Sequence, residues 1–239
     1  MRTLVTTAAV VLVFATIASA SVNEKERTRI NDAVAVLNDL RSTPDKDIPQ
    51  GLWDRADCVA VFPSVKKAAF VVGGEYGKGL MSCRTQGGWS APSFMTLGKG
   101  SVGFQIGGES VDLVLLVMNK NGMDKLLNNK VSLGTDVSVA AGPIGRDARA
   151  ATDAQMKAEI LSYSRSQGIF AGLDVSGGEL KPDGDANRDL YDRQVEARAI
   201  LTDRSLSVPA EAKPFEAALS HFSATGAAGA SARKQDKQD

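Results

Sequence analysis

The sequence predicts a single-domain α+β protein in which several helices cover a curved, glycine-rich antiparallel sheet that is open or barrel-like. Three observations predict this class. Short apolar, β-prone runs follow one another closely from residue 58 to residue 119, and glycines separate them at intervals too irregular for a helix. Each glycine would cost about 1 kcal/mol in a helix interior, whereas strand bends and bulges use glycine. Helical periodicity is found only outside this region.

The first twenty residues have the pattern of a secretory signal peptide. Arg2 precedes an apolar run, and small residues at Ala18 and Ala20 form an A-x-A-like site, so we expect cleavage between Ala20 and Ser21. A transmembrane anchor is the alternative, but about ten apolar residues are too few to span roughly 30 Å of hydrocarbon. We therefore expect a soluble mature protein that is periplasmic or secreted, with peripheral membrane association if it binds lipid.

Two further features bound the function. The chain has 28 Lys and Arg residues against 28 Asp and Glu residues, so nucleic acid is not an expected partner. Its two cysteines, Cys58 and Cys83, lie in predicted strands. A disulfide between them is chemically permitted in an exported protein. Two buried free thiols remain the alternative, because sequence spacing does not fix the Cα separation that a bond requires.

The first predicted element is an amphipathic helix from Asn23 to Leu40. Its apolar positions recur at helical spacing: Ile30, Ala33, Val34, Leu37 and Leu40. Pro44 and Pro49 then block continuation of the helix. A short helix is expected over residues 50–56.

Strands are expected next, separated by turns that contain Gly or Pro. Their predicted ranges are 58–62, 68–77, 80–85, 91–97, 102–107 and 111–119. Such close spacing favours antiparallel neighbours. A short helix over 121–129 and β structure over 131–142 should follow, and after a polar stretch two alternating strands should form a hairpin around residues 167–168. Helices are expected over 185–201 and 209–222, and the small, polar tail from residue 223 should be disordered.

The chain offers few groups for catalysis. Its sole histidine, His221, falls at the end of the last predicted helix, where a surface position is the simpler interpretation. The glycine string 73–79 lacks a phosphate-loop pattern, because Val72 stands where the first Gly is needed and Gly79 where Ser or Thr is needed. We therefore expect no enzyme, no metal and no cofactor.

One segment partly matches the pattern of a calcium-binding loop. Residues 183–192 place oxygen ligands at alternate positions, as in the first half of an EF-hand loop. Arg188 occupies the position of the sharp-turn glycine, and Gln194 occupies that of the bidentate glutamate. A turn followed by a helix N-cap is the simpler interpretation.

Five cations recur at the turns and ends of the β region and are candidates for binding lipid phosphates: Lys66, Lys67, Lys78, Arg84 and Lys99. The alternative is that they are simply solvated. The first helix offers a second membrane mode, lying in the interface with its apolar face down. Its Ala and Val positions and its mixed polar face favour packing in the core instead.

Three segments carry a resemblance to a known family. They are ADCVAVFPSVKKAAFVVGGEYGKGL (56–80), GGWSAPSFMTLGKGSVGFQIGGE (87–109) and SYSRSQGIFAGLDVSGGEL (162–180), and in this order they resemble the SYLF domain, also called the Ysc84 actin-binding domain. The resemblance covers roughly residues 25–200 and implies a SYLF-like domain over residues 21–222. Its members are non-enzymatic modules that bind lipid or, in yeast endocytic proteins, actin. Trp89, Ser90 and Pro92 match the motif, and we assign them first to structure.

The sequence thus leads to a non-enzymatic SYLF module of the bacterial cell envelope that binds anionic phospholipid through its cations. The alternative is a structural or protein-interaction module whose partner is an envelope protein or a host protein such as actin. Salt should separate the two, because peripheral lipid binding weakens with ionic strength.

Overall fold

The computed structural model describes residues 23–41, 48–69, 72–102, 107–128, 130–145, 155, 157–166 and 169–222. The expected signal peptide and the expected disordered tail lie outside these residues. No helix in the described ranges is long and apolar enough to cross a membrane.

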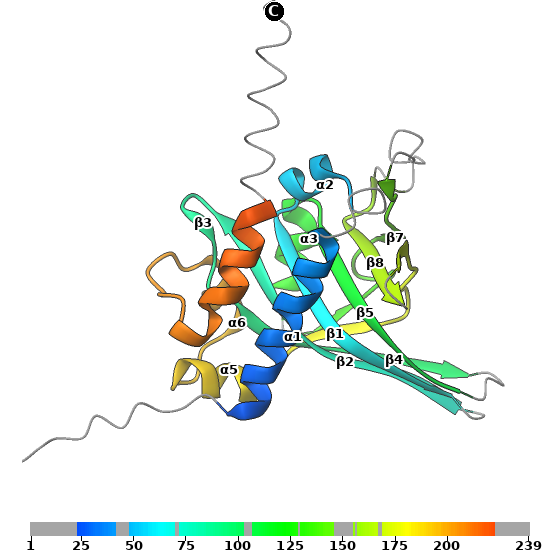
Figure 1. The fold of residues 1–239 in the computed structure, drawn as a ribbon, viewed down its shortest axis with the longest axis horizontal. Helices are drawn as coiled ribbons and strands as arrows, with labels where there is room; N and C mark the ends of the chain where they lie inside the picture. Colours follow the sequence, from blue (N-terminus) through cyan, green and yellow to red (C-terminus); the bar gives the residue numbers. More distant parts are fainter. Residues whose placement is uncertain are drawn as a thin grey trace, which may run out of the picture.

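A strongly curled sheet organises the fold (Figure 1). Along its main path the strands follow the order β6-β10-β4-β2-β1-β5-β8-β7, while β3 pairs with β2 and β9 pairs with β8. Their bounds are β1 (Cys58–Ala69), β2 (Val72–Thr85), β3 (Gly88–Trp89), β4 (Ser93–Val102), β5 (Gly107–Val117), β6 (Val131–Ser132), β7 (Val139–Ala141), β8 (Ile160–Ser166), β9 (Ile169–Gly172) and β10 (Glu179–Pro182). All paired strands are antiparallel except β7 and β8, which run parallel. The expected class, α+β with a curved sheet, is confirmed, and the sheet is mixed because of this one pair.

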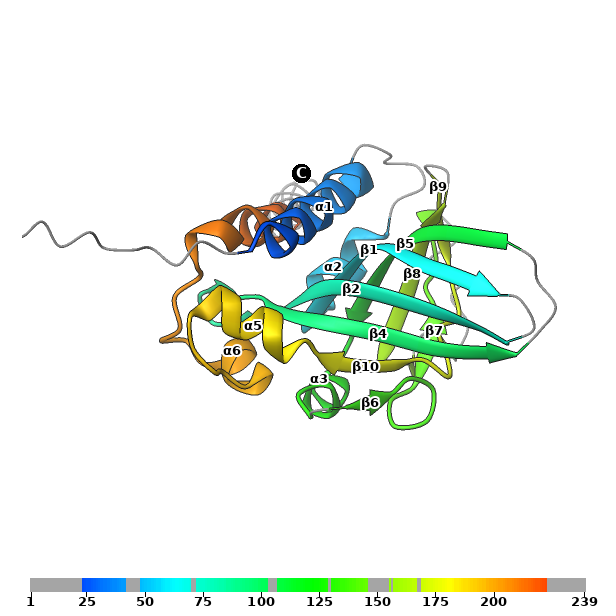
Figure 2. The same cartoon turned by 90° about the horizontal axis from the view of Figure 1, so that it is seen from below.

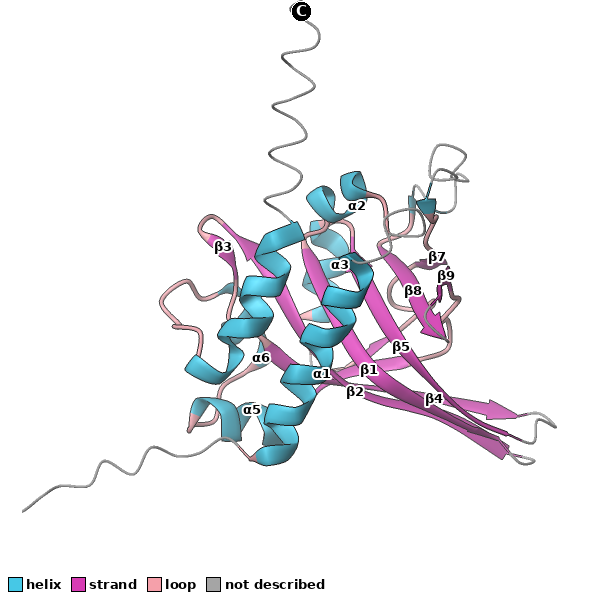
Figure 3. Ribbon diagram, in the orientation of Figure 1, coloured by secondary structure: helices cyan, strands magenta, loops and turns pink. Residues whose placement is uncertain are grey.

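Helices cover the sheet, as the colouring of Figure 3 shows. Their bounds are α1 (Glu24–Arg41), α2 (Gln50–Arg55), α3 (Lys120–Leu126), α5 (Gly184–Tyr191), α6 (Ala197–Thr202) and the 3-10 turn η3 (Ala210–Ala212), which leads into a helix over residues 213–222. Figure 2 shows α1 and the last helix side by side over one face of the sheet, with α3 on the opposite side. The expected helices at both ends and the helix after β5 are confirmed.

Two apolar cores lie on the two faces of the sheet. Successive residues of a strand point to opposite faces, and β1 accordingly sends Val59 and Val61 into the core under α1, and Ala60 and Phe62 into the core on the α3 side. Four of the five predicted apolar positions of α1 are buried, namely Ile30, Ala33, Leu37 and Leu40. Val34 is only half-buried, and Val36, which was not predicted, is buried in addition. At the end of the helix over residues 213–222, Phe222 stacks on Trp53 of α2 with ring centroids 4.2 Å apart.

Several predicted strand boundaries are wrong. β1 does not end at residue 62 but continues through Pro63 to Ala69, because the register shifts between Phe62 and Val65 and so accommodates a residue that cannot donate to the ladder. The predicted strand 68–77 thus includes the end of β1 and the start of β2, and the predicted strand 102–107 includes the end of β4 and the start of β5; residues 70–71 and 103–106 between them lie outside the described residues. Glycine-rich runs reveal extended structure but not the point at which the chain reverses.

The predicted helix over 185–201 is also wrong in extent. α5 ends at Tyr191, Asp192 has a left-handed φ of 53°, and α6 starts only at Ala197. A residue in this conformation commonly ends a helix. In contrast, the hairpin between β8 and β9 is confirmed, with Ser166 opposite Ile169.

Candidate functional site

Four strands extend beyond the rest of the sheet and form an arm (Figures 1 and 2). On one side β8 last pairs with β5 at Asp112, and on the other side β10 last pairs with β4 at Gly98. Past these points only β5, β1, β2 and β4 continue, paired in this order. The arm comprises residues 66–69, 72–76, 98–102 and 107–110.

The arm begins at an irregularity in β1. Ser64 has a φ of 52°, and its backbone N–H donates to the Asp112 carboxylate at 2.9 Å. On β2, Gly77 and Gly79 permit close approach of β1, since a Cβ at Gly79 would lie 2.2 Å from the carbonyl oxygen of Val61. These features bring β2 tightly against the bulged strand where the arm leaves the body.

Three of the five predicted lipid-binding cations lie on this arm. Lys67 is opposite Glu75, which is in turn opposite Lys99, so the three form one row across β1, β2 and β4. Directly paired residues of an antiparallel ladder share a face. Lys67 and Glu75 form a loose ion pair of 4.0 Å. Hydrogen bonds from Ser176 hold the pKa of Asp174 below its usual value, and the charge of nearby Lys99 adds to this effect.

Lys66 lies on the other face of the arm, opposite Tyr76. Its side chain is exposed and makes no ion pair with the described residues. Tyr76 is 52% exposed. Sequence analysis missed this tyrosine, and its only signal was an aromatic residue at the alternate position between glycines of a strand.

Lys78 has an internal partner. Its ammonium group lies 3.0 Å from Asp183, which also accepts a hydrogen bond of 3.0 Å from Arg29. The Arg29 guanidinium is buried, lies 3.7 Å from Glu26 and stacks over Phe94 at 4.7 Å. This buried charge cluster joins α1, β2 and the start of α5. Helical spacing could have indicated it, because Glu26 falls on the apolar side of α1, four residues before Ile30.

Arg84 lies at the far end of β2 from the arm. Its Nε donates to the Ala56 carbonyl at 2.9 Å and another guanidinium nitrogen donates to the Trp53 carbonyl at 2.7 Å. The group also stacks over Trp89 at 4.5 Å. Burial lowers the pKa of Arg84, partly opposed by Asp54 and Asp57. The five candidates are therefore divided into three on the arm and two with internal contacts, and the three on the arm face two sides.

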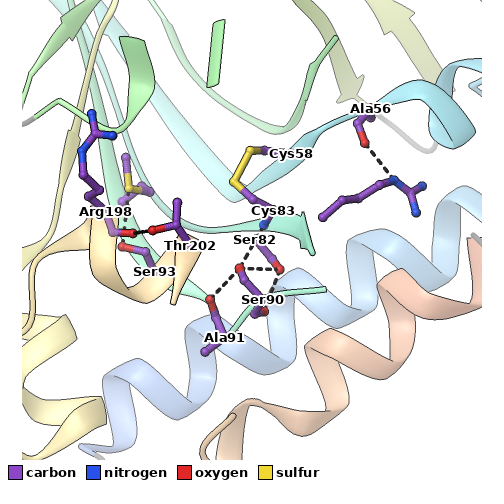
Figure 4. Close-up of a disulfide and its surroundings, with 11 residues drawn as sticks. Ala56, Cys58, Ser82, Cys83, Ser90, Ala91, Ser93, Arg198 and Thr202 are labelled. Atoms are coloured by element: carbon purple, nitrogen blue, oxygen red, sulfur yellow. Dashed lines mark hydrogen bonds between the residues drawn. A yellow bond between two sulfur atoms is a disulfide. The ribbon is translucent and has the colours of Figure 1, made fainter. Parts of the chain in front are cut away.

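A disulfide joins β1 and β2 near Arg84 (Figure 4). Cys58 and Cys83 are directly opposite in the ladder, and both are fully buried. Beside them the Ser90 hydroxyl accepts a hydrogen bond of 3.0 Å from the Cys83 backbone N–H and donates one of 3.0 Å to the Ala91 carbonyl. Ser90 and the buried Trp89 thus fasten β3 to β2, which is a structural role.

The sole histidine and the calcium-like segment 183–192 lie outside the arm. His221 is exposed on the last turn of the helix over 213–222. Asp183, the first residue of the calcium-like pattern, is at the N-cap of α5 and is held by Arg29 and Lys78. The side-chain amide oxygen (Oδ1) of Asn187 accepts a hydrogen bond of 2.7 Å from the Phe94 backbone N–H. These oxygens therefore join α5 to the sheet.

Comparison with known proteins identifies relatives. The model of the Ysc84 family, described as Las17-binding protein actin regulator, matches residues 98–222. An SH3 domain-containing protein of Schizosaccharomyces pombe is 38% identical over 65% of this chain and 37% of its own length. LAS seventeen-binding protein 3 of Saccharomyces cerevisiae is 34% identical over 70% of this chain and 37% of its own length. SH3 domain-containing YSC84-like protein 1 of Bos taurus is 32% identical over 76% of this chain and 53% of its own length. The chain thus spans between 37% and 53% of the length of these relatives.

Proposed function

The chain belongs to the Ysc84 family, also called the SYLF family, and from this premise we propose that it is a non-enzymatic recognition module that binds anionic phospholipid surfaces through its arm. The single observation that carries this proposal is the position of Lys66, Lys67 and Lys99 on strands that project from the body (Figure 1). Cations on a projecting element can reach a flat charged surface without obstruction by the helices. Lysine ammonium groups near a bilayer are attracted to its anionic headgroups.

The recognition would use charge-assisted hydrogen bonds between lysines and phosphate oxygens. Lys66 and Lys99 make no ion pairs with described residues, so neither must break one to meet a phosphate. Lys67 forms the loose ion pair with Glu75 among the side chains that the structure describes, and Glu109 is opposite it on β5. Lys78 and Arg84 have internal partners, and we assign them to stability.

Two observations favour a binding role over catalysis. The family and several relatives are named for binding and regulation. In this chain, the buried hydroxyls of Ser82 and Ser90, in and beside the family motif, are hydrogen-bonded to backbone or to each other. A buried polar network of this kind stabilises structure.

Vesicle co-sedimentation tests the proposal. Residues 21–239 would be mixed with vesicles of phosphatidylcholine alone or with about 30% phosphatidylglycerol, at low salt and at about 0.15 M salt. We expect binding only to the anionic vesicles, weaker at the higher salt. Changing Lys66, Lys67 and Lys99 to Ala should reduce binding about tenfold or more, since each lysine near the surface contributes about 1 kcal/mol.

The matched control removes the same charge from the body. Lys120, Lys157 and Lys213 are exposed and lie outside the arm, so their triple change to Ala should leave most of the binding intact. Equal loss in both triple variants would mean that net charge, and not the arm, determines binding. Absence of binding to anionic vesicles at low salt would refute the proposal.

A protein of the actin cytoskeleton is the second candidate partner, because the family description and the yeast relatives' names refer to actin regulation and Las17 binding. Co-sedimentation with filamentous actin tests it, and binding through a packed interface should persist at salt that abolishes vesicle binding. The expected export of the mature chain to the periplasm or medium decides which partner it can meet. N-terminal sequencing of the protein recovered from each cell fraction tests that export.

A further inference from the structure

Tyr76 is one of the two large apolar side chains that are exposed in the described part of the chain, the other being Ile169. It is 52% exposed and lies in the arm, away from both cores. A tyrosine can bury its ring and keep its hydroxyl hydrated, so it is suited to a boundary between an apolar and a polar phase.

The neighbours of Tyr76 on the same face include lysines and several glycines, which have no side chain. Lys66 is directly opposite on β1, and Gly98 is directly opposite on β4. Lys78 is two residues further along β2, so its side chain is on the same face, where Asp183 holds it. In the next row outward Gly74 is opposite Gly100. The ring therefore lies between Lys66 and the glycines of β4. Beyond Gly98 the same row continues to Glu179, whose charge is paired with Lys130 at 2.6 Å.

Packing within the chain does not account for two of these glycines. A Cβ at Gly98 or at Gly100 would meet no atom within 4 Å. On the neighbouring strand the situation is opposite, because a Cβ at Gly77 would lie 2.7 Å from Val65. Glycine in a strand interior often marks a site where another molecule approaches the backbone closely. Here the open glycines flank the exposed tyrosine.

We propose that Tyr76 is an interfacial anchor: the Lys66–Tyr76–Gly98 face of the arm lies against an anionic bilayer, with the tyrosine ring at headgroup depth and Lys66 at the phosphates. The occupant of this face is a lipid surface because its cationic and aromatic composition matches the charged and apolar layers of the interface. The inference rests on the proposed function and adds a component of binding that salt does not screen. It also fixes which face of the arm meets the membrane: Lys66 lies in the contact, and Lys67 and Lys99, on the opposite face, contribute attraction over a longer range, within a Debye length of the surface.

The first test compares Tyr76→Ser with Ile169→Ser on phosphatidylcholine vesicles containing about 30% phosphatidylglycerol. The two side chains are exposed to nearly the same extent, 52% and 53%, but Ile169 lies in β9, separated from β2 by β1, β5 and β8. At about 0.15 M salt we expect Tyr76→Ser to weaken partitioning about fivefold to tenfold, as for losing on the order of 50 Å² of buried apolar surface. Ile169→Ser should bind like the unchanged protein.

The second test places a reporter at the site. The two native tryptophans, Trp53 and Trp89, are buried, so Tyr76→Trp adds the exposed indole of interest. Brominated lipids should quench its emission and vesicles should shift that emission to shorter wavelength. Binding to anionic vesicles that persists unchanged in Tyr76→Ser, with no quenching of Trp at position 76, would overturn the anchor and leave the proposed function standing. A protein that binds no anionic vesicle would overturn both.

Discussion

The guanidinium of Arg29 lies 3.0 Å from the carboxylate of Asp183, although 154 positions separate the two residues in the chain. The pair joins α1 to the start of α5, and Lys78 of β2 is bonded to the same carboxylate oxygen. Burial alone would raise the pKa of Asp183, but hydrogen bonds from Lys78 and Arg29, together with their charges, lower it below its ordinary value. The folded state therefore favours the ionised carboxylate.

We expect Asp183→Asn to lower the free energy of unfolding at pH 7 by about 2 kcal/mol, because it removes the charge partner of a buried arginine. Since the folded pKa is depressed, this stabilisation is present above the unfolded pKa of about 3.9 and is lost as pH falls through the folded value. The difference between variant and unchanged protein should thus shrink below about pH 4. Urea unfolding at several pH values measures it. Asp185→Asn, at an exposed neighbour, is the control and should have little effect.

Glu159 fastens α3 to the sheet and provides a second prediction. Its carboxylate accepts hydrogen bonds from Lys125 at 2.8 and 3.0 Å, from the Ser138 backbone N–H at 2.8 Å and from Asn121. Burial would raise the pKa of Glu159, but the bonds from Lys125 and Ser138 lower it. Glu159→Gln should lower the free energy of unfolding by about 2 kcal/mol and speed amide exchange in α3. Asp124→Asn, at an exposed position of α3, is the control. Equal amide exchange of α3 in the two variants would contradict the role of Glu159.

The disulfide can be tested by chemistry and by stability. Both sulfurs are joined in the disulfide, so a thiol reagent should find no reactive cysteine before or after unfolding in the absence of reductant. The bond spans 25 positions, and replacing both cysteines by Ala should reduce the free energy of unfolding by about 3 kcal/mol. Two thiols titrating in denaturant would show that the cysteines are not joined in the purified protein.

Two glycines allow a matched test of the strand geometry. A Cβ at Gly79 would lie 2.2 Å from the Val61 carbonyl oxygen and 2.6 Å from the Phe62 ring, whereas a Cβ at Gly98 would meet nothing within 4 Å. Gly79→Ala should therefore destabilise the fold by about 3 kcal/mol, as expected for overpacking against backbone. Gly98→Ala should change stability by less than about 0.5 kcal/mol. Thermal unfolding measures both, and equal effects would be inconsistent with the close approach of β1 and β2.

Part of the candidate site could be predicted and part could not. The lysines were identifiable because they interrupt apolar strands near turns, but their grouping depends on register. A shift of one residue moves every side chain to the other face. The bulge at Ser64 therefore decides that Lys66 shares a face with Tyr76 while Lys67 shares one with Glu75. Neither a bulge nor a register is visible in the order of residue types.

The sequence by itself determined the elements whose signals are local. The apolar spacing of residues 30–40 specified α1, and the prolines after it ended the helix. The density of glycine and β-prone residues specified a sheet. The left-handed conformation of Asp192, which divides the predicted helix over 185–201 into two, was visible only in the structure.

Only the tertiary structure decided which distant groups meet. No local pattern pairs Arg29 with Asp183 or sets Glu75 between Lys67 and Lys99, because these placements follow from strand order and from packing of α1 and α5 on the sheet. Periodicity reports which face of an element is buried, and long-range contacts depend on how the buried faces are assembled.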